Sequence, residues 1–194
     1  MIVNGQHTNL ISEKTTKTKL EATPEPSPFE KLNWLVHLQH VRGEITACNE
    51  LIKREIDRSN GKNEYAFYKQ GSILREEGKI QDALESFQKC LKLNPENPDN
   101  LKEVAKCLYE MRRFRLSMEA YLEAERVSKN PDWQIYYYLG QCLMKLGDVA
   151  RAKDYAHKAV KVGKHENCYA LLIKILISEG DLKSAIAVSS AAVE

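Results

Sequence analysis

Two histidines and a cysteine near the start of the chain have the types and spacing that could bind a metal. His37 and His40 are three residues apart, which places both side chains on one face of a helix, and Cys48 follows in the same stretch. Imidazole nitrogens and a thiolate are zinc ligands, but a structural zinc site takes four ligands and this group supplies three. The favoured interpretation is therefore ordinary packed or solvated histidines, with no metal and no cofactor.

Neighbouring acids offer a second kind of chemistry. Glu76 and Glu77 lie near an expected helix end, where they face water, whereas general acid–base catalysis needs a closed pocket that shifts the pKa of such groups. The sequence also lacks the P-loop, GxGxxG, HExxH and GxSxG motifs. We expect a protein that is not an enzyme, with no catalytic residues.

The five cysteines are an odd number and include no CxxC pair. Cys48, Cys90 and Cys107 fall at small or apolar positions of expected helices. Such a distribution is typical of reduced, buried thiols in a cytoplasmic protein.

Composition and charge exclude several classes of function. Lysines and arginines number 29 against 27 acids, so the net charge is +2, and no basic stripe for nucleic acid is present. No run of eighteen apolar residues exists, which argues against direct membrane insertion. The first residues have no apolar core of a signal peptide, and Ile2 stands where myristoylation requires glycine.

The stretch that organises the chain is 64–97, which predicts two amphipathic helices around Gly78. Apolar and small residues recur at helical spacing on both sides, and Asn94–Pro95 ends the second helix. Glycine fits at position 78 because it takes the left-handed cap conformation without steric cost. Gly71 and Ala83 let the two helix axes approach closely.

Copies of this hairpin follow at a constant period. The small residue of the second helix recurs at steps of 34, 35 and 33 residues, as Ala83, Ser117, Ala152 and Ala185. The turn position recurs in step as Gly78, Arg112, Gly147 and Gly180. Because a left-handed arginine costs about 1 kcal/mol, we expect the turn at Arg112 to be built differently.

The periodicity divides the chain into a tail and an array. Residues 1–28 are polar, lack a period and end in a proline-rich segment, so we expect a disordered tail whose last part is a linker or, alternatively, a docking motif. Ser27 and Pro28 read as the start of the first helix, and Asn130 and Pro131 as the start of another. The expected repeats are 29–62, 64–97, 98–131, 133–165 and an incomplete 166–194. The early end is interpreted as a fragment or truncated product rather than as an array that continues onto another surface.

The period and pattern resemble the tetratricopeptide repeat. Gly71, Ala83, Phe87 and Pro95 fit its signature, and Leu139–Gly140, Ala152 and Ala159 fit it again. The resemblance implies an all-α, right-handed α-solenoid whose first helices line a concave groove. On that register the inward residues are Tyr65, Tyr68, Ser72, Arg75, Lys102, Lys106, Tyr109, Gln134, Tyr137, Gln141 and Met144.

Tyrosines interleaved with lysine and arginine favour a peptide-binding surface. The expected protein-binding groove comprises Tyr65, Tyr68, Arg75, Lys102, Lys106, Tyr109, Tyr137 and Gln141. The alternative is that several of these tyrosines pack between neighbouring helices. Capture of a chaperone tail is disfavoured, because the clamp asparagines are replaced by Tyr68 and Ser72 and by Glu103 and Lys106.

Three segments resemble one family more closely: KLNWLVHLQHVRGEITACNELIKREI, EYAFYKQGSILREEGKIQDALESFQKC and PDNLKEVAKCLYEMRRFRLSMEAYLEAERV. They are similar to the family of the fourth Bardet–Biedl syndrome protein, a tetratricopeptide subunit of the BBSome coat complex. Asn33-Trp34-Leu35 and Asn100-Leu101-Lys102 are the most specific points, and the likeness covers residues 29–194, the front of a longer protein.

This second resemblance implies a scaffold that carries membrane-protein cargo to and from cilia. Its partners would be other BBSome subunits, pericentriolar satellite proteins and, through the complex, ciliary cargo. The implied location is the cytoplasm, cilium, basal body and centrosome region. The alternative function is a free-standing adaptor that binds a partner peptide in the groove.

Overall fold

A computed structural model describes residues 30–192 of the chain, and all regular structure in that range is helical. The expected tail and the helix start at Ser27 and Pro28 lie outside the described residues. Ten helices form five consecutive hairpins: α1 (Asn33–Val41), α2 (Ile45–Arg58), α3 (Glu64–Glu76), α4 (Ile80–Leu93), α5 (Pro98–Glu110), α6 (Phe114–Val127), α7 (Trp133–Leu146), α8 (Val149–Gly163), α9 (Glu166–Ser178) and α10 (Leu182–Ala191).

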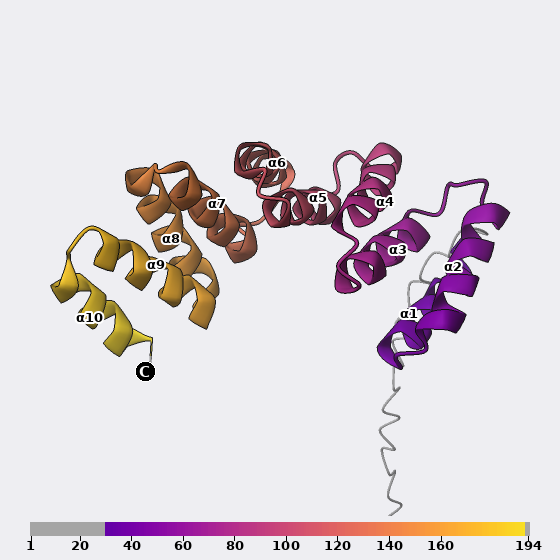
Figure 1. Cartoon of the computed structure of the whole chain (residues 1–194), viewed down its shortest axis with the longest axis horizontal. Helices are drawn as coiled ribbons and strands as arrows, with labels where there is room; N and C mark the ends of the chain where they lie inside the picture. Colours follow the sequence, from indigo (N-terminus) through magenta and orange to yellow (C-terminus); the bar gives the residue numbers. More distant parts are fainter. Residues whose placement is uncertain (1–29, 193–194) are drawn as a thin grey trace, which may run out of the picture.

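The hairpins follow one another along an arch (Figure 1). In its middle, α3 and α5 lie on the inner side, and α4 and α6 lie on the outer side. This arrangement confirms the all-α solenoid. No helix within residues 30–192 combines the length and apolarity needed to cross a membrane.

The turn inside every hairpin has the same construction, including the one that contains Arg112. Arg112 has φ +61°, and the equivalent Gly78 has φ +78°. The Arg112 N–H donates to the Tyr109 carbonyl as the Gly78 N–H donates to the Arg75 carbonyl, at 2.9 Å each. The expectation of a different turn was therefore wrong, because the packing of α5 on α6 holds arginine in the conformation that glycine adopts elsewhere.

The recurring small residues lie in the contacts between paired helices. Ala83, Ala152 and Ala185 are no more than 5% exposed. Ser117 is also fully buried, and its hydroxyl donates to the Ala105 carbonyl at 2.8 Å. That hydrogen bond lets a polar residue occupy a position where alanine is found in the second, fourth and fifth repeats.

Apolar side chains form a series of clusters along the array rather than one central core. One cluster joins α5, α6 and α7 around Tyr121 and Leu139, and the next joins α7, α8, α9 and α10 around Leu143 and Leu172. Each hairpin therefore covers the apolar face of its neighbour, as expected for a repeat protein.

Asparagine, aspartate and histidine side chains begin most of the first helices of the hairpins. The Asn97 side chain accepts a hydrogen bond from the Asp99 N–H and thereby caps the start of α5. For α7 the predicted Asn130–Pro131 start was two residues early: Asp132 is the cap, and its carboxylate accepts from the Gln134 N–H at 2.8 Å. The carboxylate of aspartate satisfies that N–H directly, which sets the start of the helix.

Candidate protein-binding surface

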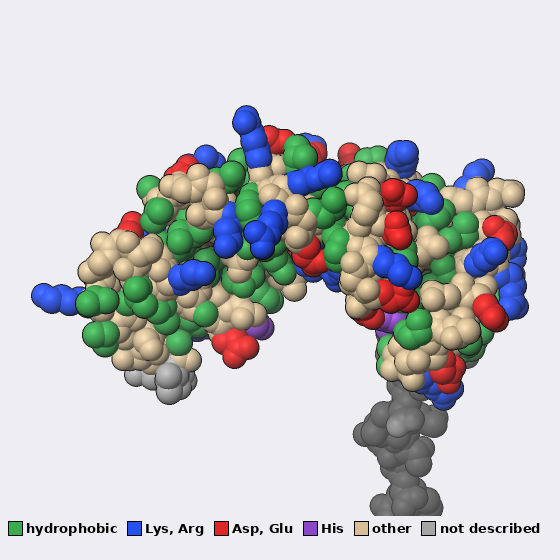
Figure 2. Space-filling model, viewed as in Figure 1, with side chains coloured by type: hydrophobic (Ala, Val, Ile, Leu, Met, Phe, Trp, Pro, Cys, Tyr) green, Lys and Arg blue, Asp and Glu red, His purple; other side chains and the backbone are tan. Residues whose placement is uncertain are grey.

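The first helices of the five hairpins and the residues just before them form one continuous side of the array, here called the inner surface. It contains two hollows to which the second helices contribute no residue. The amino-terminal pocket encloses about 620 Å³ between α1, α3 and α5. The carboxy-terminal pocket encloses about 320 Å³ between α5, α7 and α9. Figure 2 shows the molecule hollowed beneath the arch.

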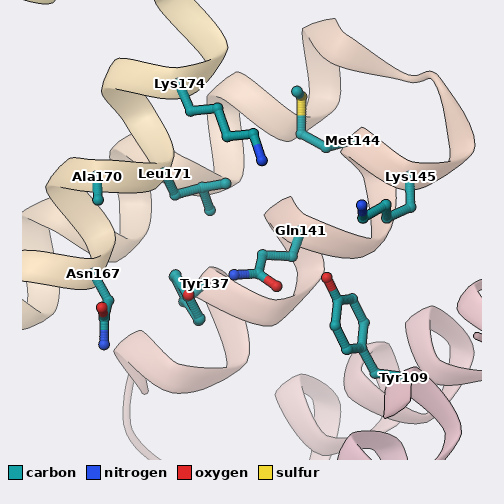
Figure 3. Close-up of a pocket in the computed structure, with 9 residues that line it drawn as sticks. All are labelled: Tyr109, Tyr137, Gln141, Met144, Lys145, Asn167, Ala170, Leu171 and Lys174. Atoms are coloured by element: carbon teal, nitrogen blue, oxygen red, sulfur yellow. The ribbon is translucent and has the colours of Figure 1, made fainter. Parts of the chain in front are cut away.

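The carboxy-terminal pocket is built from three successive first helices (Figure 3). Its lining residues are Tyr109, Tyr137, Gln141, Met144, Lys145, Asn167, Ala170, Leu171 and Lys174. Leu171 is 6% exposed and supplies an apolar wall. The amino groups of Lys145 and Lys174 and the Tyr109 hydroxyl point toward the space beside Gln141 (Figure 3).

The two lysines of this pocket are exposed and unpaired. Lys145 and Lys174 make no ion pair or side-chain hydrogen bond with any of residues 30–192. The pocket lining contains no aspartate or glutamate. The pocket therefore combines positive charge with apolar and aromatic surface.

The tyrosines of this pocket are held by other rings. Tyr138 meets Tyr109 edge-on at 5.9 Å and Tyr137 at 5.1 Å, and it stacks on the buried Tyr121 at 5.2 Å. Burial raises the pKa of both Tyr109 and Tyr137, so both phenols stay neutral at physiological pH. Tyr109 and Tyr137 thus pack against neighbouring rings and also line the pocket.

The amino-terminal pocket contains the other two predicted tyrosines. Its lining residues are Glu30, Asn33, Glu64, Tyr65, Tyr68, Asn97, Asp99 and Asn100. The Glu64 carboxylate accepts hydrogen bonds from the side-chain amides of Asn97 and Asn100 at 2.9 and 2.7 Å, which joins α3 to the start of α5. Burial, followed by the charges of Glu103 and Asp99, raises the pKa of Tyr68 to about 12.

Arg75 and Lys106 of the predicted groove line neither pocket, and both are paired within the protein. The Arg75 guanidinium and the Lys106 amino group each lie 2.8 Å from a carboxylate oxygen of Glu103. Glu103 is 7% exposed, so the Arg75–Glu103 ion pair joins α3 to α5 in a largely buried setting.

Lys102 is likewise paired and lines neither pocket. Its amino group lies 2.8 Å from both Asp99 and Asp132, which ties α5 to the cap of α7. Burial lowers the pKa of Lys102, but the two carboxylates outweigh it and raise the pKa overall, so the lysine stays charged.

The remaining candidates from the sequence are placed as follows. The Ser72 hydroxyl donates to the Tyr68 carbonyl, and Met144 lines the carboxy-terminal pocket. The Cys48 thiol donates to the Val36 carbonyl at 3.4 Å, and His40 lies 3.4 Å from Glu76. Residues 30–192 contain no group of three or more side chains arranged to hold a metal.

Sequence reasoning missed several residues of the two pockets, among them Lys145, Lys174 and Glu30. Lys145 lies in the last turn of α7, and its position one residue after Met144 is the signal that could have found it. Lys174 lies on α9, whose inward register was not assigned from the sequence.

Comparison with known proteins identifies the repeats. The tetratricopeptide repeat family matches residues 64–97 and residues 133–165. The hairpin between them, α5 and α6, has the same architecture despite Arg112 and Ser117. The chain is therefore built from tetratricopeptide repeats.

One curated relative is the "BBSome complex member BBS4" of cattle (Bos taurus), which is 38% identical over 184 residues, 95% of this chain and 35% of the relative. The chain thus spans about a third of the length of this and two other curated relatives.

Solved structures share the fold at lower identity. A structure of MamA from its position 41 to its end, from Desulfovibrio magneticus, has a TM-score of 0.75 and 19% identity, and the match covers 86% of this chain and 94% of that one. The first tetratricopeptide repeat domain of Spaghetti (RPAP3), bound to an HSP90 peptide, has a TM-score of 0.58 and 16% identity, and the match covers 60% of this chain and 93% of that domain.

Proposed function

We propose that this chain is a non-enzymatic scaffold subunit of a BBSome coat complex. In that role it binds other BBSome subunits and pericentriolar satellite proteins. Through the complex it contributes to the transport of membrane proteins to and from cilia. Its place in the cell is then the cytoplasm, the cilium and the basal body and centrosome region. The inner surface is the part that binds a partner chain.

One observation carries the proposal: the identity to the BBSome relatives is higher than the fold alone requires. MamA reaches a TM-score of 0.75 with 19% identity, whereas the cattle relative is 38% identical over 95% of this chain. A repeat hairpin needs small and apolar residues at its packing positions and leaves its surface residues free. Identity beyond that level supports a shared binding surface and, with it, a shared assembly.

The structure supports a surface for proteins in preference to a reaction chamber. Both pockets open along the array, and their polar groups are spread over three helices each. Neutral, rigid tyrosine rings beside lysines give a partner segment contact area and polar contacts at a low cost in side-chain entropy.

Affinity purification from ciliated cells tests the proposal. The tagged chain is expected to recover BBSome subunits identified by mass spectrometry. The double variant Lys145→Glu/Lys174→Glu should lose at least part of that set, because it reverses the charge of the carboxy-terminal pocket. Lys161→Glu on α8, away from both pockets, is the matched control. Recovery of no BBSome subunit by the unaltered chain would overturn the proposal.

The second candidate is a free-standing adaptor that binds a partner peptide in the same surface. The unpaired lysines of the carboxy-terminal pocket favour it, since they suit a peptide without any larger assembly. Gel filtration of a ciliated-cell lysate separates the two: an adaptor elutes with one small partner, and a coat subunit elutes in a large complex.

A further inference from the structure

The two pockets of the inner surface have opposite charge. The amino-terminal pocket is lined by three carboxylates, those of Glu30, Glu64 and Asp99, and by no lysine, arginine or histidine. Asp99 is already paired with the Lys102 amino group at 2.8 Å, so Glu30 and Glu64 are the two pocket carboxylates without an ion pair among residues 30–192. The carboxy-terminal pocket is lined by Lys145 and Lys174 and by no carboxylate. The chain as a whole is near neutral, so this separation is a local property of the inner surface.

A buried, unpaired acceptor in the wall of the amino-terminal pocket points to a ligand that donates hydrogen bonds. Asn100 is 1% exposed, and its Nδ2 donates to Glu64 at 2.7 Å, which fixes the direction of the amide. Its Oδ1 has no hydrogen-bond partner among residues 30–192. An unpaired buried carbonyl costs about 1–3 kcal/mol, and a donor entering the pocket would recover part of that cost after a small side-chain shift.

The aromatic side chains of this pocket suit a cation. The amino group of Lys69 already lies over the Tyr65 ring at 5.7 Å from its centroid. Tyr68 is a neutral phenol, so it adds an uncharged aromatic surface rather than another anion. A guanidinium group brings N–H donors for carboxylates and for the Asn100 carbonyl, and a flat face for a ring.

The carboxy-terminal pocket suits the opposite charge. Its two unpaired amino groups face the same space beside Gln141, and Leu171 and Met144 give apolar surface nearby (Figure 3). A carboxylate on a short aliphatic stem matches both features. Three cations of the neighbouring first helices, Arg75, Lys102 and Lys106, already have carboxylate partners and do not compete for it.

We propose that the inner surface binds a partner segment of mixed charge, with an arginine side chain in the amino-terminal pocket and an acidic side chain in the carboxy-terminal pocket. The proposal rests on the proposed function in that the segment belongs to a partner protein. It goes further by stating the chemistry of that partner.

The helix α5 sets the minimum separation between the arginine and the acidic residue of the partner segment. Asp99 near its start lines one pocket and Tyr109 near its end lines the other. Ten residues of helix span about 15 Å, which about five residues of extended chain cover. The charged residues of the partner are therefore at least about five residues apart.

Synthetic peptides test the proposal on the full 194-residue chain. Glycine–serine spacers of about five, eight and eleven residues join two arginines, two glutamates, or one arginine and one glutamate. The mixed peptide is expected to bind at least about tenfold more tightly than either like-charged peptide, because it fills both pockets at once. Isothermal calorimetry measures the affinities, and two-dimensional NMR of the ¹⁵N-labelled chain locates each end.

Neutral isosteres and matched variants assign each charge to its pocket. Replacing arginine by citrulline, or glutamate by glutamine, should remove the tenfold advantage. Glu30→Gln/Asp99→Asn should weaken arginine binding alone, and Lys145→Gln/Lys174→Gln should weaken glutamate binding alone. Glu119→Gln on α6 and Lys161→Gln on α8 are the controls and should change neither.

Equal binding of mixed and like-charged peptides, or perturbation of the same pocket by arginine and glutamate, would overturn the proposal. So would citrulline peptides that bind as tightly as arginine peptides. If the peptides fail in this way while purification still recovers BBSome subunits, the charge proposal falls and the scaffold function stands.

Discussion

The Arg75 guanidinium lies 2.8 Å from the Glu103 carboxylate and thereby joins the second repeat to the third. Lys106 contacts the other oxygen of the same carboxylate at 2.8 Å. Two cations that the sequence assigned to a binding groove are therefore part of the packing between repeats. The positive charge of the carboxy-terminal pocket comes instead from Lys145 and Lys174, which have no ion-pair partner among residues 30–192.

Replacing Glu103 by glutamine should destabilise the array. The substitution leaves Arg75, which is 25% exposed at its side chain, and Lys106, 18% exposed, without their carboxylate. We expect a loss of about 1–3 kcal/mol in the free energy of unfolding, measured by urea denaturation. Glu119 forms an exposed ion pair with Arg115, in which the two charged groups lie 3.5 Å apart. Glu119→Gln should therefore change the free energy of unfolding by less than about 0.5 kcal/mol. Equal losses in both variants would contradict the structural role of Glu103.

Replacing Arg112 by glycine should stabilise the third repeat. Arg112 has φ +61°, a conformation that glycine adopts without steric cost. Because glycine also loses more backbone entropy on folding, we expect a net gain of about 0.5–1 kcal/mol, measured as a rise in Tm. The adjacent Arg113 has φ −85° and provides a matched control, since Arg113→Gly should give no gain. A lower Tm for Arg112→Gly would show that its side chain contributes contacts that outweigh the strain.

Adding one methyl group at Gly71 should separate α3 from α4. A Cβ built there would lie 2.8 Å from Cζ of Phe87, a ring that is fully buried. Overpacking of this kind costs about 1–3 kcal/mol, so Gly71→Ala should lower the urea midpoint. Ser72→Ala at the next position removes a hydroxyl that bonds the backbone of its own helix, and it should have a much smaller effect. An unchanged midpoint for Gly71→Ala would mean that the Phe87 ring moves aside freely.

The five cysteines should resist alkylation until the chain unfolds. All five are free and buried, and burial raises the pKa of Cys90 and Cys107 to about 12 and that of Cys142 to about 11, from an ordinary value of 9.0. The thiolate is the reactive species, so iodoacetamide near pH 8 should label the native chain slowly and the urea-unfolded chain at all five positions. Mass spectrometry counts the labels. Rapid labelling of Cys90 without denaturant would contradict its burial.

The same thiols determine how stability changes at high pH. Their pKa is higher in the folded than in the unfolded chain, so their contribution is fully present below about pH 9 and is lost as the pH rises toward 12. Tyr68, whose pKa is raised to about 12 from 10.0, acts in the same direction from pH 10 upward. Urea midpoints should therefore fall between pH 9 and 12 and stay level between pH 7 and 8.

The sequence determined the repeat and its hairpins. The positions of Gly78, Ala83 and Pro95 follow from local conformation and from contacts within one hairpin, so a single copy of the pattern is enough to place them. Gly180, the last copy of the turn position, accordingly lies between α9 and α10.

The tertiary structure decided which charges are free. The Arg75–Glu103 and Lys102–Asp132 pairs join residues about one repeat apart, so they depend on how neighbouring hairpins are offset and not on spacing along one helix. The same offset gathers Tyr109, Gln141 and Lys174 from three helices around one pocket. The energy of an ion pair is large at short distance and falls with separation. A small difference in the offset between hairpins therefore decides whether a cation pairs with a carboxylate of the next repeat or stays available to a partner.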